Sequence, residues 1–161
     1  HRVLNWLEIN NAEWERQYYE IADFLAPYNI VKCGVDSQGM GSAVAERLDL
    51  ILGNRMDIVP VNSDLATQDK RWSHLTQLLQ RNLIIYPGHS KARRTRTWKS
   101  FRQQMEDAEK VVKGQYILIQ APADTKDAHD DYVDSLAIAT AMTMGALTDD
   151  SVESLEAPWF R

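Results

Sequence analysis

The spacing of apolar residues along the chain predicts strands that alternate with helices. Four short apolar runs have the length and composition of strands, at residues 3–9, 30–35, 58–61 and 83–86. Apolar positions three and four residues apart predict three helices, over residues 13–25, 42–52 and 64–80. Strands and helices that alternate in this way indicate an α/β fold.

The C-terminal half of the chain continues with a different order of elements. We expect a helix over residues 95–108 and then a hairpin, whose strands 110–112 and 115–120 flank a Lys113-Gly114 turn. A loop is expected at 121–128 and an apolar, buried helix at 129–144. A chain of 161 residues fits one domain. We expect this domain to span residues 1–148, with residues 149–161 as a C-terminal tail.

The composition excludes several classes of protein. Cys33 is the single cysteine, so no internal disulfide can form. No apolar run approaches the roughly 20 residues that a membrane-spanning helix needs, and we expect no membrane partner. The sequence has neither a phosphate-binding loop of the nucleotide-hydrolysing motors nor Cys and His residues at a zinc-binding spacing.

Positive charge is concentrated in one short stretch of a chain whose net charge is −5. Between residues 91 and 102 there are six basic residues and no acids: Lys91, Arg93, Arg94, Arg96, Lys99 and Arg102. Uninterrupted positive charge suits contacts with the phosphates of DNA or RNA. The alternative is an ordinary solvated helix face. Trp98 and Phe101, which lie in the same stretch, are expected to be core contacts rather than platforms for stacked bases.

Acidic residues at two places have the pattern of a catalytic site. Asp36 follows a buried apolar run and precedes a glycine-containing loop, which places it at the carboxyl edge of the sheet, where α/β folds bind ligands. Asp131 and Asp134 share a helix face near the helix N-terminus, where the helix dipole favours negative charge. The alternative is that these acids are ordinary turn and helix-start residues.

Carboxylates in such a set suit metal-dependent hydrolysis. Mg²⁺ takes carboxylate oxygens as ligands, and two ions held by shared aspartates can hydrolyse a phosphodiester. His129 and Asp130 are adjacent candidates for accessory roles, with His129 as a base or a weak ligand. A helix-cap or structural role is the alternative for His129.

Two motifs resemble those of a known family. The residues His129 to Ala137 (HDDYVDSLA) resemble the last catalytic motif of the nuclease domain in the large subunit of tailed-phage terminases, and Val35 to Gly41 (VDSQGMG) resembles its middle acid motif. The resemblance implies an RNase H-like mixed sheet flanked by helices. It also implies two Mg²⁺ or Mn²⁺ ions and cleavage of concatemeric double-stranded viral DNA. Asp36, Asp131 and Asp134 would be the metal-binding catalytic acids, and Lys113 would lie beside the DNA path.

The same resemblance implies further properties of the full-length protein. Its partners would be the terminase small subunit and the portal protein, and it would act in the host cell cytoplasm. The family's first acid lies on a first, central strand that has no counterpart in this sequence. We therefore expect a fragment of a longer protein, without that strand and without the family's motor domain, whose active site is incomplete.

Two other functions stay open at this point. The Asp-x-x-Asp helix is also similar to that of bacterial Holliday-junction resolvases, which share the RNase H-like fold. A non-enzymatic DNA-binding or assembly module is the other alternative, in which the acids cap helices and the basic stretch grips DNA or a partner.

Overall fold

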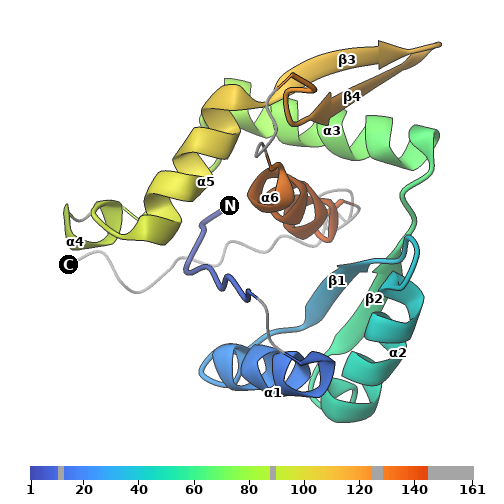
Figure 1. Cartoon of the computed structure of the whole chain (residues 1–161), viewed down its shortest axis with the longest axis vertical. Helices are drawn as coiled ribbons and strands as arrows, with labels where there is room; N and C mark the ends of the chain where they lie inside the picture. The colour runs from blue at the N-terminus through green and yellow to red at the C-terminus, as the bar shows by residue number, and fades with distance from the viewer. Residues whose placement is uncertain (11–12, 88–89, 125–128, 145–161) are drawn as a thin grey trace, which may run out of the picture.

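The computed structural model describes residues 1–10, 13–87, 90–124 and 129–144 (Figure 1). The helices in these residues are α1 (Trp14–Leu25), α2 (Gly41–Leu52), α3 (Leu65–Gln80), α4 (Ser90–Arg93), α5 (Arg96–Asp107) and α6 (Asp131–Ala141). The strands are β1 (Lys32–Asp36), β2 (Asp57–Val61), β3 (Glu109–Lys113) and β4 (Tyr116–Gln120). None of the described helices is long and apolar enough to cross a membrane. The predicted tail at 149–161 lies outside the described residues.

The described strands form one parallel and one antiparallel pair. β1 and β2 run parallel, with Lys32 opposite Asp57 at one end and Asp36 opposite Val61 at the other. β3 and β4 form the predicted hairpin, although Lys113 still pairs with Tyr116, so the turn falls one residue later than expected. The predicted mixture of helices and strands is confirmed, with the strands in two separate pairs across the described residues.

Two predicted strands, at 3–9 and 83–86, are wrong. Arg2 and Ile85 form an isolated parallel bridge, and the described backbone bonds around it join His1 and Val3 to Ile85 and the amino group of His1 to the carbonyl of Leu83. An apolar run becomes a strand only where a neighbouring segment accepts and donates backbone hydrogen bonds along its whole length. Beyond Val3, the N-terminal segment makes no further described backbone hydrogen bond to Ile85. The short helix α4 at the start of the basic stretch is a further element that the apolar pattern did not predict.

Helix α6 lies between the two halves of the fold (Figure 1). On one side it shares a core with α3 and β4, made of Trp72, Leu75, Leu78, Ile84, Leu118, Val133 and Ala137. On its other side, α6 packs against β1. A second core joins α1 to α2, and its buried residues are Tyr18, Leu48, Leu52 and Met56. α6 therefore holds the β1–β2 pair at a fixed distance from α3 and the hairpin.

Gly34 allows the close approach of β1 to α6. A Cβ atom at this position would lie 2.6 Å from Cγ2 of Ile138 and 3.1 Å from the sulfur of Met142. Because Gly34 has no side chain, the strand lies directly on the helix, and Asp36 follows two residues later at the strand's end. This contact sets the separation between Asp36 and the first turns of α6.

An aromatic cluster joins the N-terminal segment to α5 and α6. The rings of Trp6, Tyr86, Trp98, Phe101 and Tyr132 contact one another with centroids 5.2 to 6.3 Å apart. The Tyr132 hydroxyl also donates to the Glu8 carboxylate at 2.9 Å, and burial together with this bond raises the pKa of Tyr132 to about 12. Phe101 is thus a core residue and Trp98 is half-buried against it, so both make packing contacts as predicted, and the charged side chains of α5 are exposed.

Candidate active site

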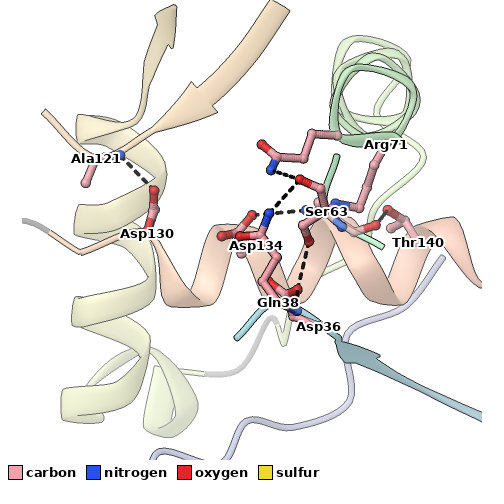
Figure 2. Close-up of polar contacts among 10 residues, drawn as sticks. Asp36, Gln38, Ser63, Arg71, Ala121, Asp130, Asp134 and Thr140 are labelled. Atoms are coloured by element: carbon pink, nitrogen blue, oxygen red, sulfur yellow. Dashed lines mark hydrogen bonds and ion pairs between the residues drawn. The ribbon is translucent and has the colours of Figure 1, made fainter. Parts of the chain in front are cut away.

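Asp36 is fixed at the carboxyl edge of the parallel strand pair. One of its oxygens, Oδ1, accepts hydrogen bonds from the backbone N–H of Gln38 at 3.0 Å and from the hydroxyl of Ser63 at 2.8 Å (Figure 2). Ser63 follows β2 as Asp36 ends β1, and its side chain is buried. A Cβ at Gly41 would overlap the carbonyl oxygen of Asp36, so glycine is required where the chain turns back into α2.

Two acids at the start of α6, Asp130 and Asp134, line the same pocket as Asp36. Asp130 precedes the helix with φ −126° and ψ 10°, and its Oδ2 accepts from the backbone N–H of Ala121 at 2.9 Å. Asp134 lies one turn further along, and the two carboxylates share a helix face as residues i and i+4. Figure 2 shows Asp134 beside Ser63 and Asp36, with Asp130 at the start of the helix.

Asp131 and His129 lie outside this pocket. The Asp131 side chain is 84% exposed, and its described ionic contact is with the exposed ring of His129, at 3.8 Å. At the first helical position its carboxylate points to solvent rather than toward β1. The structure therefore brings together Asp36 and Asp134 of the predicted acids, and it favours Asp130, predicted as accessory, over Asp131 as their companion.

The three carboxylates line a cavity of about 140 Å³, enough for several water molecules. The other lining residues come from the loops after β1 and β2, from α3 and from the hairpin: Gln38, Ser63, Gln68, Arg71, Lys113, Leu118, Ile119 and Gln120. Lys113 is the one predicted DNA-binding residue that lines it. The cavity is therefore strongly polar, and the hairpin forms part of its wall.

The environment of Asp134 disfavours its charged form. Burial is the largest cause, and the neighbouring Asp130 and Asp36 add repulsion, while Arg71 partly offsets both. Together they raise the pKa of Asp134 from 3.8 to about 6. A carboxyl with a raised pKa in a cavity that holds other acids is a functional-site candidate, because a cation bound there would relieve the same repulsion.

The donors in the cavity fit a hard divalent cation. One oxygen of each carboxylate already has a polar contact. At Asp36 this oxygen accepts hydrogen bonds from Ser63 and from the backbone of Gln38. At Asp130 it accepts one from the backbone of Ala121, and at Asp134 it forms the ion pair with Arg71. The second oxygen of each accepts no hydrogen bond from the described residues. No group of three acids, histidines or cysteines in the described part of the chain is close enough to enclose an ion alone. Mg²⁺ is commonly held by one or two carboxylates, with waters and substrate phosphates completing its shell.

The basic stretch forms an exposed surface on α4 and the first half of α5. Its six residues, Lys91, Arg93, Arg94, Arg96, Lys99 and Arg102, are all exposed on α4, α5 and the turn between them. The far end of α5 contacts the start of α6, where the Tyr132 N–H donates to Gln104 at 2.8 Å. Some of the charge is locally engaged, because Arg102 pairs with Glu106 at 2.7 Å. We call these six residues the basic surface.

Sequence reasoning missed three residues that complete the cavity. Ser63 carried a usable signal, since it follows the strand that lies parallel to β1, and the ends of parallel neighbours meet. Arg71 carried another, because it is in phase with the buried Leu75 and Leu78 on one face of α3. Gln38 had no signal beyond its place in the loop after Asp36.

The comparisons with known proteins agree with this architecture. The sequence matches the terminase RNaseH-like domain family over residues 2–143. The large terminase nuclease from the thermophilic phage G20c has a similar fold in two crystal structures, one with bound magnesium and one with bound cobalt, each with a TM-score of 0.62 and 22% identity. The match covers 83% of this chain and 64% of that one, so this chain spans less than two thirds of the phage nuclease. No curated protein matches. The predicted RNase H-like fold is confirmed.

Proposed function

The chain belongs to the terminase RNaseH-like domain family, and from this premise we propose that it is the endonuclease domain of a phage DNA-packaging terminase large subunit. In this proposal it cuts concatemeric double-stranded DNA by metal-dependent hydrolysis of phosphodiesters, with two Mg²⁺ or Mn²⁺ ions in the complete site. The observation that carries the proposal is the convergence of Asp36, Asp130 and Asp134 on one polar cavity.

The roles of the residues follow from their contacts. Asp36 and Asp134 would hold the cations, with Asp130 as the third carboxylate at the cavity wall. The chemistry that such ions supply is activation of a water and neutralisation of charge on the leaving oxygen. Ser63 and the Gln38 backbone fix the orientation of Asp36, so the carboxylate does not have to reorganise when substrate arrives.

The path of the DNA follows the distribution of positive charge. Lys113 lines the cavity from the hairpin, and its ammonium group would contact a phosphate beside the scissile bond. The basic surface on α4 and α5 would bind the flanking phosphates, because α5 ends against the start of α6. As proposals for the full-length protein, the partners are the terminase small subunit and the portal protein, and the compartment is the host cell cytoplasm.

A plasmid-cleavage assay tests the proposal. We expect a longer chain that also carries the family's first acid to convert supercoiled plasmid to nicked and linear forms with Mn²⁺, and to stop when EDTA is added. Asp36→Asn and Asp134→Asn should reduce the rate at least about 100-fold, because loss of a proposed ligand should cost no less than the roughly 10–100-fold that loss of a residue supporting a ligand costs. Asp23→Asn, an exposed acid of α1, is the folding and charge control.

The choice between the two neighbouring acids of α6 is part of the same assay. We expect Asp130→Asn to impair cleavage and Asp131→Asn to leave most of it, because only the first carboxylate lines the cavity. The reverse result would show that the acids are wrongly assigned. Cleavage confined to four-way junctions would support the resolvase alternative. A longer chain with the first acid that neither binds Mn²⁺ nor cuts DNA would contradict the nuclease proposal.

A further inference from the structure

Arg71 is a buried charge whose contacts do not account for its burial. Its side chain is 3% exposed on α3, and it is the one charged residue among the fully buried residues that the structure describes. Its Nη2 lies 3.7 Å from Oδ1 of Asp134, which is an ion pair but too long for a hydrogen bond. Nε and Nη1 make no hydrogen bond with the described residues.

One long ion pair and a contact with the face of the Trp72 ring, whose centroid lies 5.9 Å from the guanidinium carbon, are too weak to offset the removal of a guanidinium from water. Arginine stays charged at all accessible pH values, so burial cannot be relieved by loss of a proton. A buried pair is normally stabilising only when its geometry is close and its remaining hydrogen-bonding groups are satisfied. Neither condition holds for Arg71 with Asp134 alone, so the compensating charge must come from more than one acid.

The cavity supplies that charge. Arg71 lines it together with Asp36, Asp130 and Asp134, so three carboxylates face one fixed cation. Each carboxylate is repelled by the other two, and the guanidinium is the only described positive group buried beneath them. Lys113 also lines the cavity, but it lies at the exposed end of the hairpin. Arg71 therefore shares one cavity with the whole set of acids, and Asp134 is its described ionic partner.

We propose that Arg71 is a built-in counter-cation of the carboxylate cavity, which holds the acids together before metal binds and then lowers their affinity for divalent ions. The inference rests on the proposed function, because it takes the divalent cation as the ligand of these acids. Two positive charges compete for the same carboxylates, so the arginine that stabilises the metal-free site must oppose the metal-bound one. Arg71 is a positioning residue in this scheme and touches no reacting atom.

Direct binding of Mn²⁺ to the full chain tests this role without any cleavage assay. Isothermal titration at pH 8, above the pKa of Asp134 of about 6, would compare the wild type with Arg71→Met, Arg71→Gln and Arg71→Lys. Thermal unfolding of the same proteins would be followed with and without Mn²⁺. Arg16→Met, which removes an exposed arginine of α1, is the control for net charge.

We expect both uncharged variants to bind Mn²⁺ roughly tenfold more tightly than the wild type, since a nearby positive charge is lost. Their melting temperatures should fall without metal and rise more on addition of Mn²⁺. Arg71→Lys and Arg16→Met should behave like the wild type. A variant that folds only with Mn²⁺ would also support the role.

Unchanged or weaker Mn²⁺ binding by Arg71→Met and Arg71→Gln would overturn the inference. Uncharged variants that stay unfolded both with and without Mn²⁺ would also overturn the inference, because Arg71 would then serve packing alone. If the wild type and every variant failed to bind Mn²⁺, the proposed function would fall together with the inference. Binding that is indifferent to Arg71 would overturn the inference alone.

Discussion

Asp134 carries an electrostatic penalty in the folded protein that a neutral side chain of the same shape would remove. The pKa of this carboxyl is raised from 3.8 to about 6, chiefly by burial and then by Asp130. A folded state that binds the proton more tightly than the unfolded state loses stability as the pH rises through this window. We therefore expect Asp134→Asn to stabilise the metal-free protein above pH 6 and to have little effect near pH 4.

The size of the effect follows from the pKa difference and the exposure. A difference from 3.8 to about 6 corresponds to about 3 kcal/mol for a fully buried group. The Asp134 side chain is 39% exposed, so solvent screening reduces the expected gain to about 1 kcal/mol. The same substitution should abolish Mn²⁺-dependent cleavage, because it removes a proposed ligand. Stability and activity would thus change in opposite directions.

Urea unfolding in EDTA at pH 4 and pH 7.5 measures this directly. Asp131→Asn is the matched control, because it removes the same charge from the same helix turn at a side chain that is 84% exposed. We expect the control to change the free energy of unfolding by less than about 0.5 kcal/mol at either pH. The reasoning is refuted if Asp134→Asn destabilises the protein at pH 7.5, or if the control stabilises it equally.

Three further predictions concern the scaffold and the DNA surface. Gly34→Ala should destabilise the protein by about 1 to 3 kcal/mol in urea unfolding, because its methyl group would press on Ile138. Tyr132→Phe should lower the free energy of unfolding by about 1 kcal/mol, and a double-mutant cycle with Glu8→Gln should show that the two losses are not additive. Arg94→Ala should reduce the salt dependence of DNA binding, measured by fluorescence anisotropy, by about 0.9 in the log–log slope. An unaltered urea-unfolding curve would contradict the prediction for Gly34→Ala. Additive losses would contradict the one for Tyr132 and Glu8, and an unchanged slope would contradict the one for Arg94→Ala.

The apolar pattern predicted the helices because each has its own periodicity. α1, α2, α3 and α5 begin and end within one or two residues of the expected positions, and α6 is shorter but begins at the predicted acids. A helix satisfies its backbone internally, so a local pattern suffices. The strands expected at 3–9 and 83–86 had the right composition, but a strand also needs a partner along its length, which local sequence cannot reveal.

The acids of the site were predictable to different degrees. Local rules predicted Asp36 at the end of a strand and placed Asp131 and Asp134 together on one helix face. The choice between Asp130 and Asp131 did not follow from such rules, because it depends on the backbone of Asp130, whose φ of −126° turns its carboxylate to the Ala121 N–H. That contact joins the end of β4 to the start of α6, so it exists only once the tertiary structure has formed.

In the proposed function, the charge of the cavity is left unbalanced in the metal-free protein, and a bound cation would balance it. Three carboxylates face it and one buried guanidinium partly neutralises them, which leaves a net negative charge with Asp134 poised near pH 6. Complete neutralisation by arginines would make the fold more stable but would leave nothing for a cation to bind. A cavity with no internal cation would bind a divalent ion more tightly, but the three carboxylates would then repel one another without compensation in the metal-free protein. In this scheme Arg71 lies between these limits, while β1 packs directly on α6 at Gly34 and so keeps Asp36 close to the first turns of the helix.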